Sequence, residues 1–131
     1  MLTFRELRRI GRARLRDAEV LFKANRVDGA QYLCGYAIEL YLKARIGKVK
    51  GWGGFPEVDR EFDARPKKDA KIHDLQKLLV QSGLGIIPKY LTEWSSVSRW
   101  NPEMRYNVIG VADKSDVALM LDSTRTLLRV L

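Results

Sequence analysis

The sequence predicts an all-α fold, an antiparallel up-and-down bundle of four main helices plus a short helix, within a single domain spanning residues 1–131. Apolar residues recur at helical spacing along most of the chain. No segment long enough for a half-buried strand shows the alternation of apolar and polar residues that such a strand would have. The chain has 131 residues, of which 46% are hydrophobic and 31% charged. That length and composition suffice for one domain with its own core.

The first two helices are predicted between residues 3 and 47. Thr3 and Glu6 form a capping box at the start of the first helix, which should run to about Asn25. Asp28 is the predicted cap of the second helix and Gly47 its predicted stop. The second helix carries a repeat of small and large apolar residues and should be central: Ala30, Leu33, Cys34, Ala37, Leu40, Tyr41 and Ala44.

A long connection separates these helices from the rest. Glycines and prolines interrupt the helical pattern over residues 48–71, and a connection this long is often functional or mobile. A short helix is predicted from Asp74 to Ser82. A fourth helix should begin at Pro88 and be interrupted at Asn101-Pro102. Ser115 is the predicted cap of the last helix, which carries the cleanest apolar stripe in the chain.

Composition restricts the classes of function. The formal net charge is +8 at pH 7, which favours anionic partners such as nucleic acid or nucleotide phosphates. One cysteine excludes an internal disulfide, and one histidine excludes a multi-His metal site, so we expect no metal and no cofactor. No apolar run approaches the roughly 20 residues of a membrane span, and no signal peptide is recognisable. We therefore expect a cytoplasmic protein with no membrane partner.

Arginines crowd the first helix. They form either a solvated face or an electrostatic footprint for nucleic-acid phosphates. Arg14 lies on the apolar stripe and needs either an acidic partner, for which Glu39 is the first candidate, or a solvent-filled groove. The arginines are Arg5, Arg8, Arg9, Arg12, Arg14 and Arg16.

Two further segments carry candidate binding residues. Tyr32, Tyr36, Glu39 and Lys43 follow one line of the second helix, which is either a ligand-binding line or an amphipathic rim over a groove. Residues 98–107 combine arginines with aromatic rings, which suits a nucleotide or single-stranded RNA, or else a kinked helix with inward aromatics. The predicted ligand-binding residues are Arg105, Tyr106, Arg99, Lys43, Glu39 and Tyr36, with Arg105 and Tyr106 foremost.

His73 and Cys34 receive structural interpretations. His73 is the only imidazole and lies just before a predicted helix, so we expect it to pack or cap near Asp74. Cys34 lies on the buried stripe of the second helix and should be a small core residue rather than a nucleophile.

Several of these segments resemble the HEPN family, the higher eukaryote and prokaryote nucleotide-binding domains. The resemblance lies in residues 14–21 (RLRDAEVL), in residues 29–44 (GAQYLCGYAIELYLKA), in His73-Asp74-Leu75 and in Arg105-Tyr106. It covers most of the chain outside residues 48–71. It implies a helical bundle that commonly forms homodimers, often beside a minimal nucleotidyltransferase in toxin–antitoxin or other defence pairs.

Catalytic HEPN members are metal-independent ribonucleases with an Arg-x(4–6)-His motif. Arg105 matches the arginine, but residues 106–112 contain no histidine. The resemblance therefore favours a dimeric binding or partner module for a nucleotide, RNA or an associated nucleotidyltransferase. The alternatives are a ribonuclease with a degenerate site around Arg105 and a structural homodimer with no ligand.

The sequence supplies one independent reason to expect a homodimer. Trp94, Trp100, Tyr90 and Tyr106 lie close together in a small domain, and aromatic residues are enriched at interface cores.

Overall fold

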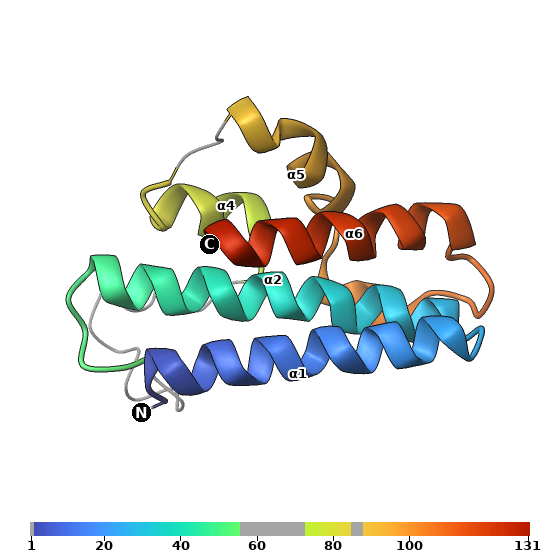
Figure 1. The fold of residues 1–131 in the computed structure, drawn as a ribbon, viewed down its shortest axis with the longest axis horizontal. Helices are drawn as coiled ribbons and strands as arrows, with labels where there is room; N and C mark the ends of the chain where they lie inside the picture. The colour runs from blue at the N-terminus through green and yellow to red at the C-terminus, as the bar shows by residue number, and fades with distance from the viewer. Residues whose placement is uncertain (1, 56–72, 85–87) are drawn as a thin grey trace.

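The computed structural model describes residues 2–55, 73–84 and 88–131. These residues form three long helices, two short ones and two 3-10 turns (Figure 1). Their only extended pairing is a single bridge between Leu2 and Phe55, so the all-α prediction is confirmed. The elements are α1 (Phe4–Lys23), α2 (Val27–Val49), α4 (Leu75–Gln81), η2 (Pro88–Tyr90), α5 (Leu91–Val97), η3 (Pro102–Tyr106) and α6 (Lys114–Val130).

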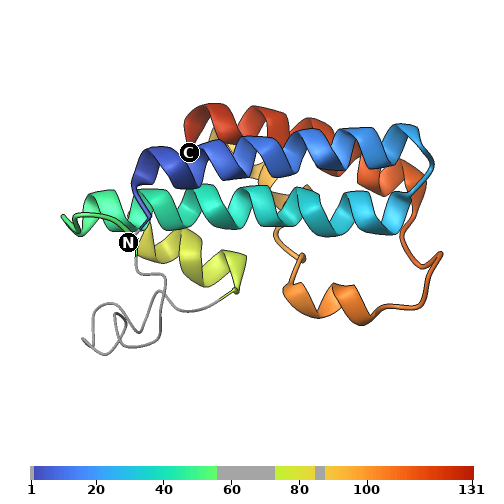
Figure 2. The ribbon, with the colours of Figure 1, turned by 90° about the horizontal axis from the view of Figure 1, so that it is seen from below.

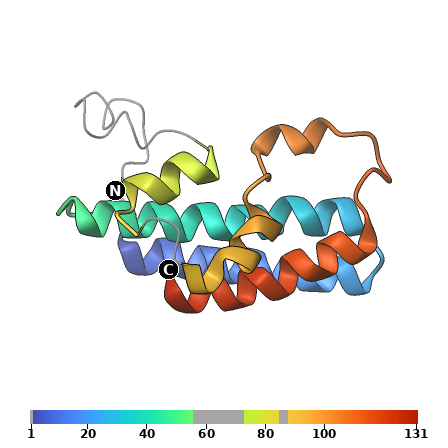
Figure 3. The ribbon, with the colours of Figure 1, turned by 90° about the horizontal axis from the view of Figure 1, so that it is seen from above.

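The three long helices form the body of the bundle. The prediction had four main helices, but the segment that starts at Pro88 gives only the seven-residue α5. α1 and α2 lie side by side in opposite directions, and α6 runs in the same direction as α2 (Figure 1). α4 and η3 lie on one side of α2, away from α6 (Figures 2 and 3). One face of α2 is therefore flanked by α4 and η3.

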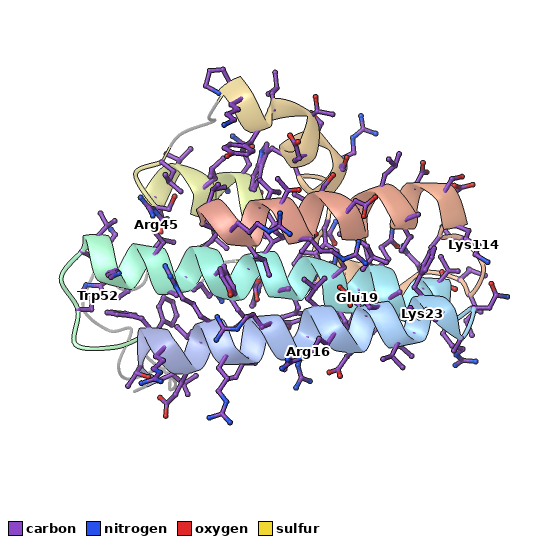
Figure 4. The ribbon with its side chains drawn as sticks, viewed as in Figure 1. Arg16, Glu19, Lys23, Arg45, Trp52 and Lys114 are labelled. Atoms are coloured by element: carbon purple, nitrogen blue, oxygen red, sulfur yellow. The ribbon has the colours of Figure 1, made fainter. Side chains whose placement is uncertain are left out.

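The C-terminal end of α1 and the N-terminal end of α6 lie at the same end of the molecule. Figure 4 places Lys23 and Lys114 there, and the Lys114 ammonium lies 5.9 Å from the centre of the Phe22 ring. Further along, Arg125 of α6 donates to Glu19 of α1 at 2.9 Å. This salt bridge joins the two helices across the edge of the core.

The predicted capping box is confirmed. The Glu6 amide donates to the Thr3 hydroxyl at 3.1 Å, and the Thr3 amide donates to the Glu6 carboxylate at 2.8 Å. These Thr3 contacts, the backbone hydrogen bond first, hold the pKa of Glu6 below its usual range. The helix ends at Lys23, and Asn25 takes a positive φ of 62° in the tight turn to α2.

Three predicted helix-end signals are wrong. Asp28 does not cap α2, which begins at Val27 without a side-chain cap, because its carboxylate accepts from the loop after η3. Gly47 lies inside α2, where a Cβ would come within 2.4 Å of the Phe4 ring. α6 is capped by Asp113, to which the Ser115 hydroxyl donates at 2.8 Å.

The core is centred on α2, and glycines on α1 and α2 allow neighbouring rings to pack closely. A Cβ at Gly35 would lie 2.1 Å from atoms of the buried Trp100 ring, and a Cβ at Gly11 would lie 2.8 Å from the Tyr41 ring. Close packing on α2 therefore depends on glycine at both points.

Cys34 is a core residue, as predicted. It is fully buried, its sulfur lies 3.0 Å from the Thr124 hydroxyl, and burial raises the pKa of the thiol to about 11. A thiol in this environment stays protonated and unreactive at neutral pH.

The start of the 48–71 connection is ordered by backbone pairing. Phe55 is buried and exchanges two backbone hydrogen bonds with Leu2, of 3.0 and 2.7 Å. The prediction of a mobile connection falls mostly on residues 56–71, which lie outside the described residues. Within the described part of the chain, no helix is long and apolar enough to cross a membrane.

Candidate functional site

The side chains of Tyr32, Tyr36, Glu39 and Lys43 form a strip along α2, which we call the α2 strip. The Tyr32 and Tyr36 rings meet edge to face with their centroids 5.3 Å apart, and Tyr36 meets Trp100 in the same way at 5.3 Å. Trp100 is itself fixed, since its indole N–H donates to the Tyr32 carbonyl at 3.1 Å. The aromatic half of the strip is therefore held by the core beneath it.

Arg105 reaches this strip from η3. Its guanidinium carbon lies 4.7 Å from the centre of the Tyr106 ring, and its Nη1 donates to the Pro102 carbonyl at 3.3 Å. Hydrogen bonding with Tyr106 first and then Tyr32 raises the pKa of Arg105. A permanently charged fork is thus placed at the tyrosine end of the strip.

The pKa of Tyr36 responds to charges at both ends of the strip, those of Glu39 and Arg105. Burial first, then a hydrogen bond with Tyr32 and the charge of Glu39, raise the pKa of Tyr36 to about 12, while Arg105 opposes the shift. The phenol therefore stays neutral and available for hydrogen bonding across the physiological range.

The other end of the strip is built on a buried carboxylate. Glu39 is 1% exposed; its Oε1 lies 2.6 Å from His73 Nδ1 and its Oε2 lies 3.8 Å from Lys43 Nζ. Burial lowers the pKa of Lys43, and the Glu39 charge partly opposes that effect. The prediction that Arg14 pairs with Glu39 is wrong, because Arg14 is exposed and pairs with Asp17 at 3.6 Å.

A groove of about 530 Å³ runs beside the strip, between α1 and α2. A groove of this size and apolar character suits a small ligand. Its lining residues are Ile10, Arg14, Tyr32, Leu33, Tyr36 and Leu40. Because Tyr32 and Tyr36 belong to both, the two interpretations of the α2 line, a ligand-binding line and a rim over a groove, describe one surface.

The structure brings five of the six predicted ligand-binding residues to this face. Tyr36, Glu39 and Lys43 lie on the strip, and Arg105 with Tyr106 lies at its tyrosine end. Arg99 is different: it is exposed at the end of α5 and has no hydrogen bond or ion pair among the described residues.

Some arginines of α1 contact other parts of the chain, and others do not. Arg12 donates to the Tyr41 hydroxyl at 3.0 Å, and Arg8 donates to the Leu131 carbonyl at 3.3 Å. Arg16 is exposed on the outer side of α1 (Figure 4). Since three of the six arginines have partners within the chain, Arg14 with Asp17 included, α1 is not a uniform phosphate-binding face.

His73 is the site residue that the sequence interpretation missed. Asp74 does cap α4, accepting from the Lys77 amide at 3.0 Å, but His73 pairs with a residue 34 positions earlier in the chain. The available signal was a lone carboxylate well inside the central helix, which needs a polar partner. Among the described residues, no three His, Cys, Asp or Glu side chains gather as a metal site would require.

One comparison with known proteins gives a match. The family model for the HEPN domain matches residues 4–51, which comprise α1, α2 and the turn that follows. The proposed resemblance is confirmed over these residues, which include the whole α2 strip and the α1–α2 groove. No match was found among curated proteins or among solved structures.

Proposed function

We propose that this chain, whose α1–α2 pair matches the HEPN domain model, is a dimeric binding module for a nucleotide or RNA. The ligand would lie on the α2 strip. The HEPN match supports a nucleotide- or RNA-related function in general. The observation that carries the location is that Trp100 packs on Tyr32 and Tyr36 of α2 and thereby holds the segment that leads into η3, and Arg105, beside these two rings.

Each part of the face suits one part of such a ligand. Arg105 presents a planar fork that matches phosphate oxygens. Tyr106 is 73% exposed and can stack on a base, as aromatic side chains do in single-stranded RNA recognition. The groove beside Tyr32 and Tyr36 offers apolar walls for a second base or the ribose. The net charge of +8 favours the approach of such an anion.

The first prediction concerns Arg105→Ala. We expect this variant to bind ATP, GTP or a short single-stranded RNA roughly tenfold more weakly, since it loses charge-assisted hydrogen bonds. Its Tm should stay nearly unchanged, because the side chain is exposed. Titration calorimetry at two salt concentrations measures the affinity, and circular dichroism measures the Tm.

Arg99→Ala is the matched control. It removes the same charge from a nearby exposed position that has no partner among the described residues. Equal affinities of the two variants would contradict the proposed site. An Arg105→Ala variant that loses stability and keeps its affinity would make Arg105 structural.

The associated nucleotidyltransferase is the other partner class to which the HEPN resemblance points. A nucleotidyltransferase reading frame next to this one, and co-purification of its product with this chain, would favour a protein partner over a free nucleotide. Both occupants would contact the exposed Arg105 and Tyr106, so we expect Arg105→Ala to weaken either interaction.

A further inference from the structure

We propose that His73 is a second anion contact of this site, held in position by Glu39 and effective when its imidazole is protonated. The proposal rests on the proposed function, because it assigns His73 to the same ligand that Arg105 binds. It adds a residue to the site and names the ligand class as one with several phosphate groups.

The geometry leaves one ring nitrogen available. Nδ1 is engaged by Glu39 Oε1 at 2.6 Å, while the side chain as a whole is 53% exposed. Nε2 has no partner among the described residues. A carboxylate on Nδ1 fixes the orientation of the ring, as it does for histidines that bind metals or transfer protons. The opposite nitrogen is thereby directed away from Glu39.

The charges around His73 make the contact depend on its proton. From α2, Glu39 and Lys43 form one ion pair of zero net charge, and Tyr36 is neutral. From its own segment, Asp74 contributes a carboxylate that caps α4, and Lys77 contributes an exposed ammonium. A neutral imidazole leaves this group without excess charge, whereas an imidazolium adds one positive charge and a donating Nε2–H.

His73 and Arg105 flank the same strip. α4 and η3 lie on the same side of α2 in two opposite views (Figures 2 and 3). Arg105 interacts with Tyr32 and His73 with Glu39, and these α2 residues are about 10 Å apart at 1.5 Å per residue. A single phosphate group does not span that distance. A ligand with several phosphates, such as a short RNA strand, does.

The first test uses the fact that the chain has one histidine. Its imidazole proton gives a single resolved signal in an NMR titration from pH 5 to 8, the window in which histidines change charge. Sulfate is the probe, because it remains a dianion throughout that window. We expect the titration midpoint to rise in sulfate relative to chloride at equal ionic strength, in the wild type and in Arg105→Ala. Identical titrations in the two salts would overturn the proposal.

The second test uses a short single-stranded RNA. We expect the wild type to bind it five- to tenfold more tightly at pH 5.5 than at pH 8, since a charge-assisted contact forms at the lower pH. His73→Asn should bind with the weaker affinity at both pH values. Lys77→Ala, which removes a positive charge from α4 outside the Glu39 contact, should keep the pH dependence of the wild type.

The outcomes separate this proposal from the proposed function. RNA affinity that falls in Arg105→Ala but is unchanged in His73→Asn supports the site and overturns the role of His73. A sulfate-dependent imidazole titration with no RNA or nucleotide binding, or with binding unaffected by Arg105→Ala, supports His73 as an anion contact and contradicts the proposed function.

Discussion

Gly35 determines how closely the segment before η3 approaches α2. A Cβ at this position would lie 2.1 Å from the Trp100 ring, far inside contact distance. We expect Gly35→Ala to destabilise the fold by about 1–3 kcal/mol, the usual cost of overpacking, despite the roughly 1 kcal/mol by which alanine favours a helix. Urea denaturation measures the loss, and tryptophan fluorescence should report the displaced ring.

Gly29→Ala is the matched control for that variant. Gly29 lies on the same helix, where a Cβ would meet only the end of the Leu21 side chain at 3.3 Å. We expect its stability to be equal to or above that of the wild type. A Gly35→Ala variant as stable as Gly29→Ala would show that Trp100 can move without loss.

At this scale the sequence predicted part of the site. The alignment of Tyr36, Glu39 and Lys43 follows from helical periodicity alone, so it was predictable. The proximity of Arg105 to that strip is a tertiary contact, set by Trp100 packing on Gly35, and no local pattern encodes it. The His73–Glu39 contact was missed for the same reason, and Arg14 was assigned to Glu39 in its place.

Among the elements, the loop of residues 107–112 is attached to the start of α2 by Asp28. Both carboxylate oxygens accept backbone hydrogen bonds, from Gly110 at 2.8 Å and from Ala112 at 3.1 Å. These bonds, that from Gly110 first, hold the pKa of Asp28 below its usual range. Its stabilising effect is therefore fully present above the ordinary aspartate pKa and is lost as the pH falls through the lowered value.

We expect Asp28→Ala to release this loop. The amides of Gly110 and Ala112 should exchange hydrogen faster, while the amides of α2 and α6 keep their protection, since neither helix is capped by Asp28. Hydrogen exchange resolved by NMR measures this. Asp116→Ala, which removes an exposed carboxylate near the start of α6, should leave the loop unchanged, and equal acceleration in both variants would contradict the role of Asp28.

The elements show why helices were easier to predict than their ends. α1 and α6 each bury an apolar stripe whose regular period the sequence displays directly, and the central α2 is apolar and buried on most of its sides. Asp28 is a good cap in isolation, but its carboxylate pairs with a loop 82 residues away. Gly47 is of the residue type that commonly ends a helix, but it lies inside α2, where it packs against Phe4. Long-range contacts override local signals at both ends.

For the whole molecule, only half of the aromatic set that predicted a homodimer is available for an interface. Trp94 and Trp100 are buried in the core, whereas Tyr106 is 73% exposed and Tyr90 is half-buried. Exposed apolar side chains gather in the 107–112 loop, where Ile109 is 91% exposed beside Val108 and Val111. Exposed apolar residues that are grouped in this way mark interaction surfaces.

We expect light scattering to give twice the monomer mass of 15.1 kDa at micromolar concentration. Ile109→Ser should shift the equilibrium toward the monomer by removing exposed apolar area. Leu119→Ser, at an exposed position on α6, is the control and should remain dimeric. A wild type that runs as one 15.1 kDa species would remove the prediction.

The last prediction concerns catalysis by the whole chain. General acid–base groups typically contribute about 10²–10⁴-fold to a rate, and residues 106–112 after Arg105 include no imidazole, carboxylate or lysine. Arginine stabilises developing charge but is a poor proton acceptor, because its pKa lies above roughly 12. The one histidine is engaged by Glu39, and the described residues show no contact between His73 and Arg105.

We therefore expect no metal-independent cleavage of single-stranded RNA above background at neutral pH in EDTA. A gel assay with labelled RNA measures it, with the Arg105→Ala and His73→Ala variants in parallel. Cleavage by the wild type that either substitution abolishes would contradict the prediction. It would mean that a bound RNA strand, or a second copy of the chain, brings the imidazole and the guanidinium to the same phosphate, which the isolated chain does not do.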